Sequence, residues 1–141
     1  MTVEIRRAER GGEEGVKAAE HLFDDPIDLE ATRRFLAEDG NLLLIAYVDD
    51  EPAGFVSATE LTHPDEVEPE LFLNELGVDE RFRGRGLGRS LVERLWQVAQ
   101  ERGCRGMWVL TDEGNVPANR VYAAAGGRRA KSEVMYEWGE S

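Results

Sequence analysis

The chain has 141 residues, 41% of them hydrophobic and 33% charged, which is typical of one globular domain with a buried core. Its formal net charge of −12 makes nucleic acid an unfavourable partner and favours a cationic substrate attracted by the field of the molecule. A single cysteine excludes an intramolecular disulfide and no apolar run approaches the ~20 residues of a membrane helix, so we expect a cytoplasmic protein with no membrane partner.

Strands and helices are predicted in turn along the first half of the chain. Val3 and Ile5 alternate with charged residues, which predicts a strand, and apolar residues at helical spacing then predict two helices. Two apolar runs joined by the turn 49–52 predict a hairpin, and the polar segment 62–69 predicts a loop. The predicted elements are a strand over residues 3–7, helices over 13–23 and 29–37, and strands over 42–48 and 53–61.

The second half of the chain predicts a long amphipathic helix between two strands. Leu87, Leu91 and Leu95 recur on one face of this helix, with charged residues on the other. Pro117 fits only the first turn of a helix, and Gly126 suits the end of one. The predicted elements are strands over residues 70–78 and 107–110, helices over 87–102 and 118–125, and a last strand over 134–138. This order predicts one α/β domain with a mixed sheet over residues 1–141.

A glycine-rich segment, residues 83–88 with the sequence RGRGLG, follows a predicted strand and opens the long helix. Glycine lets backbone amides approach a ligand closely, and the helix N-terminus adds free N–H groups and a positive dipole end. The combination predicts a site for a phosphate-bearing cofactor. A dinucleotide fingerprint does not fit, because Arg89 or Leu91 falls where its last glycine is needed, and the chain has no Gly-Lys-Ser/Thr of a Walker loop.

Two motifs in order resemble those of the GNAT-superfamily N-acetyltransferases, which bind acetyl-CoA. The first is R-x-x-G-x-G, read from Arg83, Gly86 and Gly88. The second is N-x-x-A-x-x-x-Y-x-x-x-G, which runs from Asn115 to Gly126, one predicted strand after the first. Two motifs in the correct order and structural context are more specific than either alone.

The resemblance covers residues 41–138 and departs from the superfamily pattern at Gly127, where a bulky residue is frequent. It implies a single GNAT-like domain, with a mixed central sheet of roughly six to seven strands flanked by about four helices. It also implies acetyl-CoA as the cofactor, and a homodimer is a common assembly in the superfamily.

Within the superfamily, the chain is most similar to the aminoglycoside 3-N-acetyltransferases. The similar segments are residues 69–78, 117–126 and 132–136, together with Leu22 and the Phe and acidic residues that follow it. These enzymes often have Asp where this chain has Glu75, which would change the catalytic geometry by one methylene group.

The resemblance assigns cofactor binding to the end of the strand before the loop, to the loop, and to the second motif. The backbone amides of Leu76 and Val78 would pair with the pantetheine arm, and an amide there would also donate to the oxyanion. Asn115 would bind the pantetheine or cap its helix. The full set is Leu76, Gly77, Val78, Arg83, Gly84, Arg85, Gly86, Leu87, Gly88, Arg89, Asn115, Ala118, Asn119 and Tyr122.

Amine acetylation also needs a group that removes a proton from the ammonium and a group that protonates the leaving thiolate. Glu75 is the candidate base: strand alternation places it on the side of Leu71 and Leu73, partly desolvated, unless a local bulge reverses its facing. An ion-paired or solvent-facing carboxylate is the alternative. Tyr122 is the candidate acid by resemblance, and a core tyrosine with a satisfied hydroxyl is its alternative.

A polycationic acceptor requires carboxylates around the cleft, and three predicted loops supply them. These interpretations lead to an aminoglycoside N-acetyltransferase that confers antibiotic resistance; an acetyltransferase of a protein terminus, lysine or polyamine and a non-catalytic acyl-CoA-binding domain are the alternatives. The candidate acceptor-binding residues are Asp24, Asp25, Glu75, Asp112, Glu113 and Glu133.

Cysteine and histidine chemistry is not expected to contribute. Cys104 lies between arginines that could lower its pKa, but no histidine is near it in sequence to support a nucleophile. His21 and His63 have no metal-ligand spacing with it, so no metal site is expected.

Overall fold

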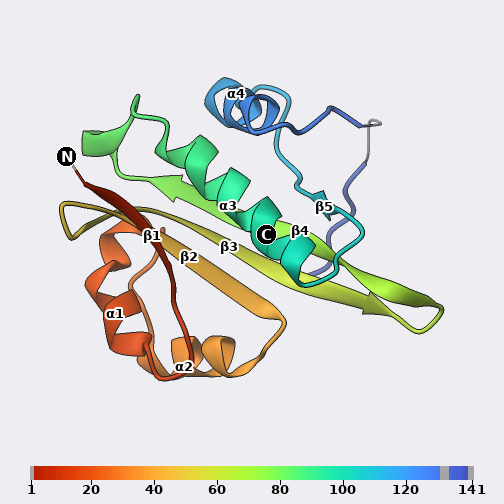
Figure 1. Ribbon diagram of the computed structural model, residues 1–141, viewed down its shortest axis with the longest axis horizontal. Helices are drawn as coiled ribbons and strands as arrows, with labels where there is room; N and C mark the ends of the chain where they lie inside the picture. The colour runs from red at the N-terminus through yellow and green to blue at the C-terminus, as the bar shows by residue number, and fades with distance from the viewer. Residues whose placement is uncertain (1, 131–133, 140–141) are drawn as a thin grey trace.

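The computed structural model describes residues 2–130 and 134–139. A five-stranded sheet in the order β1-β2-β3-β4-β5 has α1 and α2 on one face and α3, with α4 packed on it, on the other (Figure 1). The first four strands pair antiparallel and β5 joins β4 in parallel, which confirms the predicted mixed sheet. The elements are β1 (Val3–Arg7), α1 (Glu13–Ala18), η1 (Glu20–Leu22), α2 (Leu29–Ala37), β2 (Asn41–Val48), β3 (Glu51–His63), β4 (Glu66–Val78), η2 (Glu80–Phe82), α3 (Leu87–Glu101), β5 (Met107–Trp108) and α4 (Val116–Ala124).

Strand alternation divides the core into two layers, one on each face of the sheet. Residues at i and i+2 of a strand share a face, so Leu42 and Leu44 face α3 while Leu43 and Ile45 face α1 and α2. The α3 layer contains the fully buried Leu91 and Leu95 in addition to Leu42, Leu44, Val56, Leu71 and Leu73. Deleting such a leucine side chain costs about 2–5 kcal/mol, so this layer fixes the position of α3 against the sheet.

A β-bulge in β4 decides which way the candidate base points. Ser57 of β3 pairs with Glu75 and Ala58 pairs with Leu73, so Asn74 is an extra residue on the β4 side. Leu73 packs against the α3 layer, as does Leu76, whereas Glu75 lies opposite Ser57 on the α1/α2 face. The prediction that Glu75 shares a side with Leu71 and Leu73 is therefore wrong, because the bulge reverses the alternation. Its side chain is also exposed, where partial desolvation was predicted.

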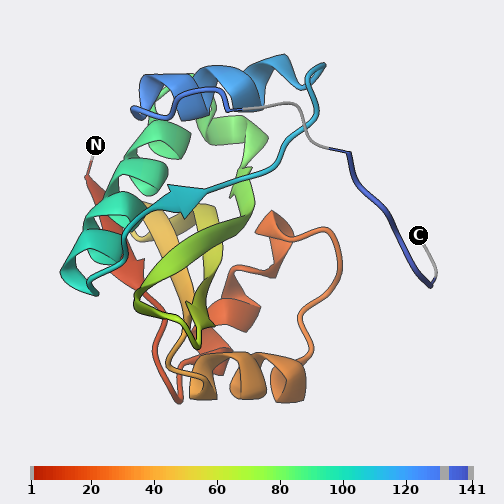
Figure 2. The ribbon, with the colours of Figure 1, turned by 90° about the vertical axis from the view of Figure 1, so that its right-hand side faces the viewer.

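β4 and β5 are neighbours over only a short distance. Their pairing is limited to Leu71 with Met107 and Phe72 with Trp108. Beyond Trp108 the chain leaves β4 and runs toward α4, as Figure 2 shows. Within residues 2–130 and 134–139, no strand pairs with the outer edge of β4 from Leu73 to Val78. This edge has backbone groups available to a ligand.

Four predicted elements differ clearly from the structure. The strand predicted over residues 107–110 is shortened to β5 (Met107–Trp108). The predicted helix over residues 13–23 divides into α1 and η1, and the predicted loop 62–69 is mostly strand, since β3 and β4 form a long hairpin that turns at residues 64–65. Residues 134–138 form no strand, so the sheet has five strands in the described residues rather than six to seven. Val134 and Trp138 are 79% and 88% exposed, so this segment lacks the neighbouring strand that would convert its apolar sequence into a sheet edge.

Candidate functional site

The glycine-rich loop lies between two buried anchors. Phe82 and Leu87 are both buried in one small cluster with Val48 and Ala53, so the loop 83–86 is fixed at each end. Gly84 and Gly86 have φ angles of +79° and +77°, a left-handed conformation that other residues adopt only with strain.

The left-handed Gly86 is the N-cap of α3 and makes no side-chain cap. The amides of Leu87, Gly88 and Arg89 belong to the first turn of the helix, where no carbonyl one turn earlier can accept from them. N–H groups of this kind, together with the helix dipole, suit an anion such as a phosphate group. A Cβ added at Gly84 or Gly86 would meet no atom within 4 Å, so both glycines are required by backbone conformation and not by crowding.

The arginines of the loop differ in how strongly they are held. Arg83 approaches Glu80 only to 3.9 Å, and Arg89 pairs with Glu93 one turn along α3 at 3.3 Å. The guanidinium of Arg85 lies 5.3 Å from the centre of the Phe82 ring. All three arginines are exposed, and exposed pairs of this kind contribute little to stability, so these charges can turn toward an anion at small cost.

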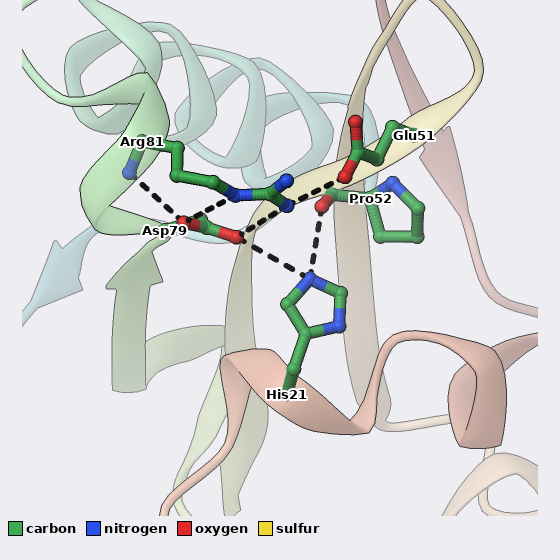
Figure 3. A network of polar contacts seen from close by, with 5 residues as sticks. All are labelled: His21, Glu51, Pro52, Asp79 and Arg81. Atoms are coloured by element: carbon green, nitrogen blue, oxygen red, sulfur yellow. Dashed lines mark hydrogen bonds and ion pairs between the residues drawn. The ribbon is translucent and has the colours of Figure 1, made fainter.

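Arg81 is exposed and anchors the entry to the loop through ion pairs (Figure 3). Its guanidinium binds Glu51 at 2.5 Å and Asp79 at 3.0 Å, and His21 Nε2 lies 3.5 Å from Asp79 Oδ2 and 3.2 Å from the Pro52 carbonyl oxygen. The hydrogen bonds from Arg81 hold the pKa of Asp79 below its usual value. The network ties η2 to the start of β3 and to η1.

The end of β4, the start of α3 and α4 meet at Gly88. A Cβ added there would lie 3.4 Å from both methyl groups of Val121 and 3.7 Å from a methyl group of Val78. Gly88 is therefore required because α3 and α4 pack closely there, and not because of an unusual backbone conformation. Tyr122, the next residue of α4 after Val121, packs partly buried against the α3 layer, as does Leu76 of β4. Burial raises the pKa of the Tyr122 phenol above its usual value, so at neutral pH the hydroxyl carries its proton and can donate it.

The segment before α4 is held by two asparagines. The Asn115 side chain accepts a hydrogen bond from the Ala118 amide at 3.3 Å and caps the helix, with Pro117 in the first turn. Asn119 Nδ2 donates to the carbonyl oxygens of Asp112 at 3.0 Å and Asn115 at 2.7 Å. Of the two roles predicted for Asn115, pantetheine binding and helix capping, the structure shows the helix cap.

Glu75 faces the α1/α2 layer next to a buried hydroxyl. Ser57 Oγ, in a side chain that is 5% exposed, donates to Glu75 Oε1 at 3.4 Å. Gly77 lies on the same face, where an added Cβ would come within 2.7 Å of the Phe55 ring and 3.2 Å of the Leu22 carbonyl oxygen. The loop after η1 is therefore pressed against the end of β4.

Of the acidic residues predicted to bind the acceptor, Asp24 and Asp25 lie near the α1/α2 face, whereas Asp112 and Glu113 lie before α4. Asp24 and Asp25 are exposed and directly follow Phe23, whose ring stacks on Phe55 at 4.1 Å between centroids. Asp112 is exposed in the segment before α4, and the Glu113 carboxylate is bound by Arg129 at 2.5 Å. Glu133 lies outside the described residues.

Cys104 is buried, and burial raises the pKa of its thiol, with a further contribution from Glu60. The structure therefore argues against a nucleophilic thiolate, as expected.

Sequence reasoning missed three residues on the α1/α2 face, namely Ser57, Phe72 and Trp108. Phe72 and Trp108 lie side by side at the last paired position of β4 and β5, with ring centroids 4.6 Å apart. The facing of Phe72 could have been anticipated from its position between Leu71 and Leu73, but the position of Ser57 beside Glu75 depends on the bulge.

Comparisons with known proteins agree with this arrangement. Residues 4–126 match the acetyltransferase (GNAT) family. A mycothiol acetyltransferase of Acidothermus cellulolyticus is 34% identical over 108 residues, and the human N-acetyltransferase 8B is 26% identical over 109 residues. These alignments cover 74% and 77% of this chain, but the chain spans only 32% and 48% of the length of those relatives.

The fold also matches a solved structure, an aminoglycoside acetyltransferase from an uncultured soil metagenomic sample in complex with sisomicin. The TM-score is 0.90 at 16% identity, with 99% of this chain and 97% of that chain covered. None of the helices in residues 2–130 and 134–139 combines the length and apolar character needed to cross a membrane. The family match over most of the chain, on a fold with a glycine-rich loop beside an open strand edge, shows that this chain belongs to the GNAT acetyltransferase family.

Proposed function

We propose that the chain is an acetyl-CoA-dependent N-acetyltransferase that acetylates an amino group of an aminoglycoside, with the 3-amino group as the expected position. The observation that carries the proposal is the open edge of β4, which includes the exposed Glu75 and leads to the amides at the start of α3, which we call the amide cradle. The amide cradle suits a diphosphate, and the Glu75 carboxylate suits an ammonium group.

The described residues fit coenzyme A. The cradle offers the first-turn amides of α3 and three exposed arginines, which suit the diphosphate. The amides and carbonyls of Leu76 and Val78, on the open edge, suit the amide groups of the pantetheine arm, which would add to the sheet as a strand does. When bound, the coenzyme supplies the activated acetyl group.

Two proton transfers follow from the positions of Glu75 and Tyr122. Glu75 accepts a proton from the acceptor ammonium, directly or through water, so that the amine nitrogen has a lone pair to form the C–N bond. As the C–S bond breaks, Tyr122 donates its hydroxyl proton to the sulfur, and its raised pKa keeps that proton available at neutral pH. Tyr122 packs with the α3 layer and Glu75 faces the α1/α2 layer, so coenzyme and acceptor would approach the open edge from opposite faces.

The charge of the molecule supports a cationic acceptor. The net charge is −12, and Asp24, Asp25 and Glu75 are exposed on or beside the α1/α2 face. Acetylation would remove a positive charge from the drug and weaken its binding to RNA, which would confer resistance. The 34% identity to a mycothiol acetyltransferase makes another small amine the second candidate acceptor.

Release of free thiol from acetyl-CoA, measured with each of several amines, tests the proposal. We expect turnover with sisomicin and related aminoglycosides, with product mass increased by one acetyl group. Turnover with spermidine or peptides alone would reject the aminoglycoside assignment, and binding of coenzyme A without turnover of any amine would reject catalysis.

A further inference from the structure

Two aromatic side chains, the half-buried Phe72 and the exposed Trp108, pack against each other where β4 and β5 separate. The rings lie 4.6 Å apart with an angle of 39° between their planes. Trp108 is 40% exposed, although it stands at the splay point of the sheet where a smaller residue could keep the backbone pairing. We call this pair the aromatic wall.

The indole of Trp108 is held in one orientation. Its Nε1 donates to Glu70 Oε1 at 2.8 Å, and Glu70 Oε2 accepts from Arg105 at 2.7 Å, with His63 Nε2 at 3.3 Å. Arg105 also contacts Glu66 on the same hairpin. Hydrogen bonds from Arg105 and Trp108 hold the pKa of Glu70 below its usual value, so the carboxylate that orients the indole stays charged at neutral pH.

The bulge at Asn74 brings the wall onto the face of the candidate base. Phe72 lies opposite Thr59 and Glu75 opposite Ser57, and Thr59 and Ser57 are two residues apart on β3 and share a face. Phe72 and Glu75 are therefore neighbours on the α1/α2 face, despite being three residues apart. Leu71, Leu73 and Leu76 point to the other face, where the proposed coenzyme-facing Tyr122 packs.

We propose that the aromatic wall is the part of the acceptor site that selects a ring-shaped cationic amine. The apolar face of the ring, and the ammonium groups at its rim, would lie against Trp108 and Phe72, while Glu75 binds the ammonium that is to be acetylated. Glu70 is a positioning residue that acts through Trp108. The inference rests on the proposed function, because it assigns the acceptor to the α1/α2 side of the open edge.

Substitution of the wall separates acceptor recognition from folding and from coenzyme binding. For Trp108→Ala we expect the KM for sisomicin to rise about tenfold, the range of an aromatic or cation–π contact, with little change in kcat or in the KM for acetyl-CoA. Trp96→Phe is the matched control, since Trp96 packs on the opposite face against the α3 layer, and it should leave all three constants unchanged.

The positioning role of Glu70 is tested by a double-mutant cycle. Glu70→Ala alone should raise the acceptor KM less than Trp108→Ala does, and it should add nothing further in the Trp108→Ala background, because its effect passes through the indole. Equal and additive effects would show that Glu70 acts independently of Trp108. Thermal melting of each variant identifies any loss due to unfolding.

Tryptophan fluorescence gives a direct test of acceptor binding, because the chain has three tryptophans and two of them can be replaced. In a Trp96→Phe/Trp138→Phe variant, Trp108 is the only tryptophan, and we expect its emission to change when sisomicin is added. An unchanged acceptor KM in Trp108→Ala, in an enzyme that still turns over, would overturn the inference. The wild type could instead acetylate only a different ring-shaped amine. If Trp108→Ala then raises the KM for that amine, the role of the aromatic wall is supported and the aminoglycoside proposal is rejected.

Discussion

Tyr122 and Glu75 divide the two proton transfers of the proposed reaction because they approach the open edge of β4 from opposite faces of the sheet. Tyr122 packs with the α3 layer, partly buried, whereas Glu75 is exposed on the α1/α2 face beside Ser57. Burial raises the pKa of the Tyr122 phenol, which keeps its proton available for transfer to the sulfur. The carboxylate of Glu75 lies open to an acceptor amine.

Replacing Tyr122 with Phe removes the proton donor and keeps the ring that packs against the core. We expect kcat to fall about 100-fold, the usual contribution of a general acid, while the Kd for coenzyme A changes little. Because burial raises the pKa of Tyr122 above its usual value, the wild type should keep the activity that depends on this proton to a higher pH than an exposed tyrosine would allow. Steady-state kinetics between neutral and alkaline pH measure both effects, and an unaltered kcat in Tyr122→Phe would assign the residue to packing.

Gly86→Ala tests the amide cradle at the start of α3. Its φ of +77° strains any residue with a Cβ by about 1–2 kcal/mol, so the loop would either become strained or change conformation. We expect the affinity for coenzyme A to fall at least about tenfold, because the amides no longer converge on the diphosphate.

Gly103→Ala is the matched control for this substitution. Gly103 has a φ of +79° and open space around it, as Gly86 has, but it follows the C-terminal end of α3. Both variants should lose similar thermal stability, and calorimetric titration should find weaker coenzyme binding only in Gly86→Ala. An equal effect of the two substitutions on coenzyme affinity would show that the amides at the start of α3 do not bind the diphosphate.

At the scale of elements, local patterns predict helices better than they predict strand registers. The helix α2 (Leu29–Ala37) has the predicted bounds, and α3 differs by one residue, because helical spacing and caps are local properties. The β4 bulge and the long β3–β4 hairpin depend on pairing between distant residues, so alternation alone placed Glu75 on the wrong face. The glycine-rich loop at the start of α3 was predictable because its glycines and the helix that follows are adjacent in sequence.

The N-terminus of α4 provides a prediction at the same scale. Asn115→Ala should reduce stability by about 1 kcal/mol, the usual value of a lost N-cap, whereas Asn115→Asp should retain the cap and the stability. Chemical denaturation measures this difference. If Asn115→Ala keeps full stability and instead weakens coenzyme binding, the side chain serves the pantetheine and the cap is incidental.

The whole molecule carries a net negative charge that would act differently on the two proposed substrates. With a net charge of −12, the protein attracts a polycationic acceptor and repels the anionic coenzyme, except at the arginines of the loop. Raising the ionic strength from about 0.01 M to about 0.15 M shortens the screening length from about 30 Å to about 8 Å. We expect the acceptor KM to rise several-fold over this range, with no parallel rise in the KM for acetyl-CoA. A neutral amine acceptor is the control, and equal salt dependence for both acceptors would contradict the role of the field.

A crystal structure with coenzyme A and sisomicin bound together tests the central claim most directly, because the claim is a placement of two ligands on opposite sides of one strand edge. The account predicts the diphosphate on the amides at the start of α3, the pantetheine along β4 from Leu73 to Val78, and an amine of the drug beside Glu75 on the α1/α2 face. Density for the diphosphate elsewhere, or for the drug on the α3 side of the sheet, would contradict it.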